Sequence, residues 1–191
     1  MTSPLEKHWH GVEYNDAERL GVRIKRVPPP APDLWHARIV VVHLLTKEEN
    51  KGNHNLYMDV IDKAGLRMNG SLLRGDNNGI KLQARIDKPA NEFGTNFALF
   101  GQDELFAWVD WVPDGGVVSS DVIMGVHTRW GGEIVGGQGY GHISYYVIWQ
   151  LTKGDTPPVP PPPGPSEDYN AGFRDGIAYA KNKILMTLGS F

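Results

Sequence analysis

Short apolar runs separated by turn-forming residues constrain the fold of this chain more than any other feature. In segment 80–86, apolar residues at every second position alternate with polar ones. A period of two residues is typical of a half-buried β-strand. Segment 36–45 contains the β-branched run 39–42, which is typical of a strand buried on both faces. With 23 glycines and 14 prolines available for turns, the pattern predicts an all-β domain.

The number and spacing of these runs indicate the architecture. About eight strands, separated by roughly 8–12 residues, are typical of a β-sandwich or jelly roll. Segments 55–62 and 66–73 flank the turn-forming residues 62–65, so we expect them to form a hairpin. The turn before segment 80–86 is expected at residues 75–79.

Composition divides the chain into four parts. Residues 27–32 are rich in proline and favour polyproline II, while segment 21–27 alternates like an edge strand. The predicted parts are an extended N-terminal arm (1–34), the sandwich (35–154), a proline-rich linker (155–165) and a C-terminal amphipathic helix (166–191).

The C-terminal helix is expected to serve assembly. Its apolar residues recur every three or four positions and so form one stripe: Phe173, Ile177, Ala180, Ile184 and Leu188. A helix of this length with two internal glycines is marginal alone in water. We therefore expect the stripe to pack against copies of itself or against another protein.

Several classes of function are disfavoured. The chain has no cysteine, which excludes disulfides, thiolate zinc sites and a cysteine nucleophile. The net charge of −3 argues against binding nucleic acid or a membrane. No secretory signal is recognised at the N-terminus, and no nucleotide-binding or nucleophile motif occurs. We expect a non-catalytic protein without a cofactor, made in the cytoplasm and acting at a virion or extracellular surface.

Histidines offer a possible metal site. His43, His54, His127 and His142 lie near the ends of predicted strands, where three of them could converge. The sandwich, however, lacks metal-ligand spacings such as HxH, and the chain's HxH pair lies in the arm at His8 and His10. Hydrogen bonds from these histidines to loop backbone are the favoured interpretation, and no metal is expected.

Aromatic residues suggest a glycan-binding surface, because sugar rings stack their C–H faces on Trp and Tyr. In segment 104–111, Phe106 and Trp108 alternate with Leu105, Val109 and Trp111, which are expected to face the core. The alternative interpretation is that most of these aromatics belong to the core. The candidate glycan ligands are Tyr57, Trp108, Trp130, Tyr140, His54, His127 and His142.

Four stretches, 43–60, 87–96, 125–128 and 141–147, resemble β-sandwich accessory domains attached to muramidase-type glycoside hydrolases and found in phage-like and environmental bacterial proteins. The resemblance implies a non-catalytic, glycan-facing module. No catalytic domain accompanies it in this chain.

Three functions follow as expectations. The leading one is a virion-associated decoration, fibre or tail protein, whose arm and helix dock on neighbouring virion or surface proteins while the sandwich faces outward. The alternative is a carbohydrate-binding module for cell-wall or surface glycan. A weaker alternative is a metal-dependent sandwich enzyme that uses His54, His127 and His142.

Overall fold

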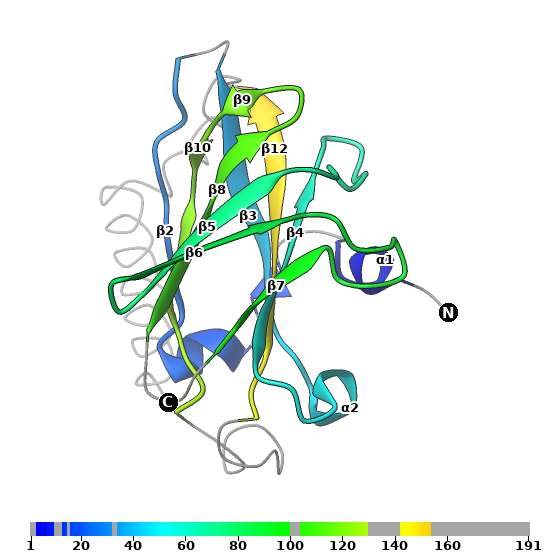
Figure 1. The fold of residues 1–191 in the computed structure, drawn as a ribbon, viewed down its shortest axis with the longest axis vertical. Helices are drawn as coiled ribbons and strands as arrows, with labels where there is room; N and C mark the ends of the chain where they lie inside the picture. Colours follow the sequence, from blue (N-terminus) through cyan, green and yellow to red (C-terminus); the bar gives the residue numbers. More distant parts are fainter. Residues whose placement is uncertain are drawn as a thin grey trace, which may run out of the picture. The chain divides into compact units, whose positions relative to one another are not determined.

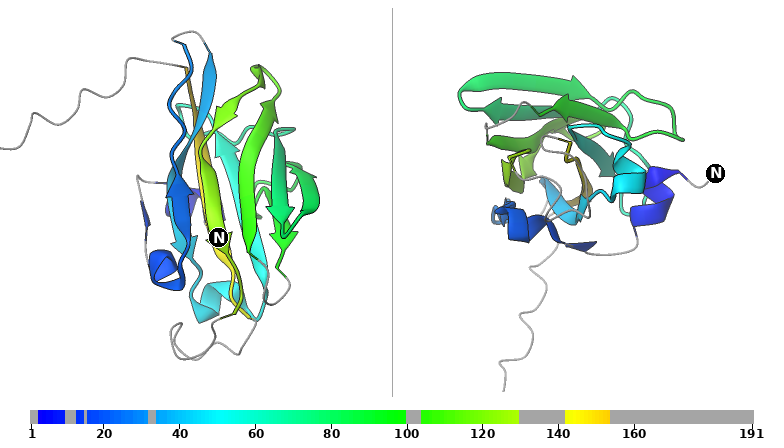
Figure 2. Two further views of the ribbon diagram at one scale, coloured as in Figure 1. Left: turned by 90° about the vertical axis from the view of Figure 1, so that its left-hand side faces the viewer. Right: turned by 90° about the horizontal axis from the view of Figure 1, so that it is seen from below.

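The computed structural model describes residues 3–9, 13–14, 16–31, 34–99, 104–129 and 142–153. They form two six-stranded β-sheets, here called sheet A and sheet B, which Figure 1 and Figure 2 show as two layers. Sheet A comprises, in order, β1 (Glu13–Tyr14), β3 (Trp35–Leu44), β12 (Tyr145–Lys153), β4 (Asn55–Ile61) and β7 (Thr95–Ala98), with β10 (Ser119–Ser120) also beside β3. Sheet B comprises β2 (Arg23–Lys25), β11 (Val122–Val126), β8 (Leu105–Val112), β5 (Leu72–Asn77) and β6 (Ile80–Arg85), with β9 (Gly116–Val117) beside β8. Short helical segments are α1 (Pro4–His8), α2 (Lys47–Asn50) and the 3₁₀ turn η1 (Asp16–Leu20).

The all-β prediction is confirmed. Of the twelve strands in the described residues, eight have four or more residues, and β3 and β6 coincide with the predicted runs. Strand β12 runs parallel to β4, whereas a jelly roll is built from antiparallel strands. Of the two predicted architectures, β-sandwich and jelly roll, the topology therefore fits the two-sheet sandwich.

Strand β12 shows how the layers are packed. Tyr145, Val147 and Trp149 point into the main core between the sheets. Tyr146 and Ile148 point to the outer face of sheet A, the side that faces away from sheet B, and are buried there in a second apolar cluster. Because both faces of this central strand are apolar, sheet A needs a cover on its outer face.

The N-terminal segment provides that cover, which corrects the prediction of an extended arm for residues 1–34. Helix α1 begins with a capping box between Ser3 and Glu6, and it buries Leu5 in the outer cluster. Trp9 lies against Gly65, where a Cβ would overlap its ring. Extended backbone does occur in β2, which is an edge strand of sheet B as predicted. The arm folds back because the outer face of sheet A would otherwise expose its apolar residues.

The predicted hairpin between segments 55–62 and 66–73 is wrong. Strand β4 lies in sheet A and β5 in sheet B, so the chain crosses between the sheets and keeps one isolated bridge, Ile61 to Arg67. The hairpin that forms joins β5 to β6 through Asn78 and Gly79, both with positive φ. This two-residue turn matches the Asn-Gly preference of tight hairpins and places residues 75–77 within β5.

The inward orientation expected for Trp111 is also wrong. Leu105, Ala107 and Val109 are buried in the core, but a register shift in β8 then makes Val112 the next inward residue. Trp111 is only half-buried, and the guanidinium of Arg85 lies over its ring at 5.6 Å from the centroid. One extra residue in a strand reverses the faces of all residues that follow.

The described residues end at 153, within the sandwich. The predicted linker and C-terminal helix therefore lie outside them. In the part of the chain that the structure describes, no helix has the length and apolar character needed to cross a membrane.

Candidate ligand pocket

An open pocket of about 330 Å³ lies on the outer side of sheet A. Strands β4 and β7 contribute its floor, the loop between β6 and β7 one wall, and Pro4 of α1 another. We call this site the Tyr57 pocket; its lining residues are Pro4, Asn55, Tyr57, Lys88, Asn91, Glu92, Phe93 and Asn96. Apolar rings and amide side chains thus line the same space.

Two stacked aromatic rings form the apolar part of the pocket. Tyr57 and Phe93 have ring centroids 4.1 Å apart and an interplanar angle of 19°. Phe93 also meets the buried ring of Tyr146 edge-on, with centroids 4.7 Å apart. Offset stacking and edge contacts of this kind are the favoured geometries of aromatic pairs. Phe93 is consequently held against sheet A from two sides.

A chain of polar side chains runs beside the stack. Lys88 Nζ donates to Asn96 Oδ1, Asn96 Nδ2 donates to Asn55 Oδ1 at 3.1 Å, and Asn55 Nδ2 donates to the Tyr57 hydroxyl at 3.0 Å. The pairing of β4 with β7 brings the two asparagines together. Each amide has further donor or acceptor capacity, which is available to a ligand with several hydroxyl groups.

A buried ion pair holds the pocket's loop in place. The side chain of Arg67 is 7% exposed and that of Asp59 is fully buried. Arg67 donates two hydrogen bonds to Asp59 and others to the carbonyls of Lys88, Pro89 and Glu92. One guanidinium therefore fixes the backbone on which Lys88, Asn91, Glu92 and Phe93 are carried.

Asp59 is surrounded by donors. Its carboxylate accepts from the Tyr146 hydroxyl at 2.7 Å and from the Gly94 backbone N–H at 3.1 Å, in addition to Arg67. Burial raises the pKa of Asp59, and the hydrogen bonds from Tyr146 and Arg67 oppose that rise. Gly94 has no room for a side chain, since a Cβ would overlap the Asp59 carboxylate. The loop can approach the sheet this closely only because residue 94 is glycine.

Of the predicted glycan ligands, Tyr57 lies in the pocket and the other described candidates do not. Trp108 is on the outer face of sheet B, opposite in β8 to the core residues Ala107 and Val109. His142 Nδ1 bonds the carbonyl of Gly52 at 2.7 Å, and its ring centroid lies 6.3 Å from that of His54. Trp130 and Tyr140 lie outside the described residues.

His127 is buried away from the pocket. Its Nε2 bonds the carbonyl of Leu20 at 2.7 Å, and its Nδ1 accepts from the backbone N–H of Arg129 at 3.2 Å. His54, His127 and His142 do not form a group of potential metal ligands among the described residues. The three histidines proposed for a metal-dependent enzyme are therefore not brought together.

Sequence reasoning missed Asn55, Lys88, Phe93 and Asn96. Residues 87–95 read as an ordered loop, and the place of that loop beside β4 depends on how the next strand pairs. The short run after Gly94 marks that strand, β7, and the structure pairs it with β4.

Comparisons with protein-family models, with curated proteins and with solved structures find no match to this chain. The resemblance to muramidase-associated accessory domains thus stays a prediction.

Proposed function

We propose that this protein is a non-catalytic β-sandwich module that binds a carbohydrate in the Tyr57 pocket. The observation that carries the proposal is the aromatic stack of Tyr57 and Phe93 beside the polar chain of Lys88, Asn96 and Asn55. Sugars present both an apolar C–H face and a ring of hydroxyl groups, so they need this combination of partners. The fixed loop adds to the argument, because a preformed site loses less entropy when it binds.

Polysaccharide binding by the full chain tests this proposal. Bacterial cell-wall glycan is the first ligand to try, since the resemblance to accessory domains of muramidase-type hydrolases points to that class. We expect Tyr57→Ala to weaken binding about 5- to 150-fold, by analogy with planar bases stacked on aromatic side chains, whose contacts are worth about 1–3 kcal/mol. Tyr57→Phe keeps the ring and removes only the hydroxyl at the end of the polar chain, so it should retain most of the affinity.

Trp108→Ala is the matched control. It removes a half-buried aromatic side chain from the outer face of sheet B, on the other side of the sandwich. Binding should survive this change. Equal losses in the Tyr57 and Trp108 variants, or none in either, would contradict the assignment of the pocket.

We also propose, from the C-terminal sequence, that a proline-rich linker and an amphipathic helix attach the sandwich to a virion or another extracellular surface. The apolar stripe from Phe173 to Leu188 supports this second proposal. Because α1 packs on its own sandwich, the N-terminal segment contributes less to attachment than an extended arm would. A decoration or tail protein can bind glycan as well, so the two proposals are compatible.

A further inference from the structure

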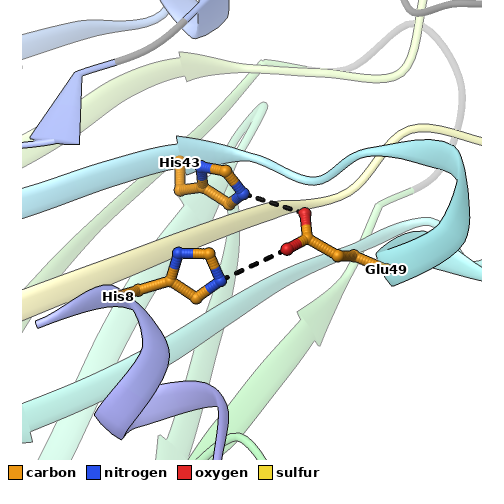
Figure 3. A group of neighbouring side chains, drawn as sticks. All are labelled: His8, His43 and Glu49. Carbon is orange, nitrogen blue, oxygen red and sulfur yellow. Dashed lines mark hydrogen bonds and ion pairs between the residues drawn. The ribbon is translucent and has the colours of Figure 1, made fainter.

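Three potential metal ligands meet where α1 lies against the outer face of sheet A (Figure 3). His8 comes from α1, His43 from β3, and Glu49 from α2. One ligand atom from each lies within 4.8 Å of the other two. His43 Nε2 is 2.9 Å from Glu49 Oε2, and His8 Nε2 is 3.4 Å from Glu49 Oε1. Both imidazoles therefore point their Nε2 atoms at a single carboxylate.

These distances are close to those of a metal site. With metal–ligand bonds of about 2.0–2.2 Å, the ligand atoms of a tetrahedral zinc site are separated by about 3.3 Å. His8 Nε2 lies 3.4 Å from Glu49 Oε1, which is close to that value. His43 Nε2 lies 2.9 Å from the other oxygen, Oε2, so the His43 ring must rotate toward Oε1 for both imidazoles to reach one ion. Two imidazoles and one carboxylate suit Zn²⁺, Co²⁺ or Ni²⁺, whereas Mg²⁺ and Ca²⁺ prefer oxygen ligands.

The three side chains are held in place by their surroundings. Glu49 closes a capping box with Thr46, so its Oε2 accepts from the Thr46 backbone N–H at 2.9 Å. The ring centroids of His8 and His43 lie 4.2 Å apart, and the His8 ring also contacts the Tyr146 ring edge-on. Side-chain exposures are 6% for His8, 9% for His43 and 17% for Glu49. An ion here would bind preformed, largely desolvated ligands.

A lysine competes for the same carboxylate. Lys7 Nζ pairs with Glu49 Oε1, but the Lys7 side chain is 56% exposed and can withdraw into water. Either an ammonium group or a metal ion can therefore neutralise the Glu49 carboxylate.

We propose that His8, His43 and Glu49 form a binding site for one divalent transition-metal ion of the zinc type, which fastens α1 to the sandwich. Three protein ligands leave one coordination position for water. The ion takes the place of the Lys7 ammonium on Oε1, while Oε2 keeps its bond to Thr46. This site is independent of the Tyr57 pocket, since the two share no lining residue.

Titration of the metal-free full chain with Co²⁺ and Zn²⁺ tests the proposal, by visible absorption and by calorimetry. We expect one equivalent to bind, with a Co²⁺ spectrum of low coordination number. His43→Gln and Glu49→Gln should each weaken binding at least about 100-fold, because loss of even a partner of a metal ligand costs about 10–100-fold. His142→Gln is the matched control: it removes a histidine outside the cluster and should bind as the parent does.

Lys7→Ala keeps the test decisive if the ligand variants fail to fold. Removal of the competing ammonium should tighten metal binding. If the three side chains only hold α1 on the sandwich through hydrogen bonds and ion pairs, the same change loosens α1 and no metal binds. The proposal is overturned if no stoichiometric ion binds, if His142→Gln lowers the affinity as much as His43→Gln, or if Lys7→Ala leaves the affinity unchanged or weaker.

Discussion

Arg67 connects the interior of the outer cluster to the ligand pocket. Its guanidinium pairs with the buried Asp59 and also holds three carbonyls of the loop that carries Phe93. A planar group with several fixed donors is needed to reach all of these acceptors at once. The fold and the pocket therefore depend on the same side chain.

Replacement of Arg67 should be costly for this reason. We expect Arg67→Met to lower the free energy of unfolding by about 3–5 kcal/mol, because it leaves the Asp59 charge buried without its partner. Arg67→Lys keeps the charge but not the fork, so it should also destabilise the protein, though less. Urea unfolding at neutral pH measures both. A loss below about 1 kcal/mol in Arg67→Met would show that the pair is not the anchor of the loop.

His127 provides a prediction on pH. Its Nε2–H donates to Leu20 and its Nδ1 accepts from Arg129, so the neutral tautomer satisfies both partners. Burial, together with the nearby Arg129 charge, holds the pKa of His127 below its ordinary value of 6.5. Burial likewise lowers the pKa of His36. In the folded state these rings bind protons less readily than in the unfolded state.

The sign of the pH effect follows from that difference. The stabilisation is complete above the ordinary pKa and is lost as the pH falls through it toward the folded pKa. Urea unfolding measured between about pH 7.5 and 5.5 should show a falling free energy of unfolding. His127→Gln, which keeps a donor for Leu20 but does not titrate, should flatten part of that slope, with the remainder due to His36. A free energy that rises toward pH 5.5 would refute this assignment.

The sequence could reveal pocket residues only where the type of side chain itself suggests a role. Tyr57, which the structure places in the pocket, was a candidate in the sequence because aromatic residues on strand faces are chemically distinctive. Asn55 and Asn96 were missed, since an asparagine signals a pocket only when a second strand brings its partner within 3.1 Å. His8 and His43 are 35 positions apart in sequence, so no spacing rule could join them.

At the scale of elements, α1 is a small helix with a large effect on sheet A. It covers the outer cluster with Leu5, provides Pro4 to the pocket wall and places His8 beside Glu49. Five residues cannot form a stable helix alone in water, so tertiary contacts must hold it. The apolar outer face of β12 supplies these contacts.

Leu5→Ala tests how strongly α1 is held. Leu5 is 8% exposed, so we expect its truncation to lower the free energy of unfolding by about 2 kcal/mol. Leu66→Ala is the matched control, because that side chain is 67% exposed and its loss should change stability by no more than about 0.5 kcal/mol. Urea unfolding of the two variants provides the comparison. Similar stabilities for both would mean that α1 does not seal the outer cluster.

Elements were easier to predict than their pairings. A two-residue period depends only on which face is buried, and it identified β6, while the β-branched run 39–42 identified β3. Pairing depends on where the chain crosses between sheets, and the turn-like residues 62–65 look the same whether β4 and β5 pair or separate. The folded arm was missed because its cause, the outer face of Tyr146 and Ile148, lies at the other end of the sandwich sequence.

At the scale of the whole molecule, the two proposed roles separate along the chain. The proposal assigns glycan binding to the sandwich with its Tyr57 pocket and attachment to residues 155–191. A variant in one part should therefore leave the other activity intact. This independence would not hold if the pocket required assembly to form, and the contacts of Arg67 with the pocket loop, all within the sandwich, argue that it does not.

The mass in solution of the full chain and of residues 1–154, measured side by side by light scattering, tests the attachment role. If the apolar stripe assembles with its own copies, the full chain should be an oligomer and the truncated chain a monomer. Ile177→Asp, within the stripe, should then dissociate the full chain, because a charge in a helix–helix contact is costly without a partner. Asn182→Asp places the same charge off the stripe and should leave the mass unchanged. Monomers in both the full and truncated chains would rule out self-assembly and leave attachment to a different protein as the form of the proposal to pursue.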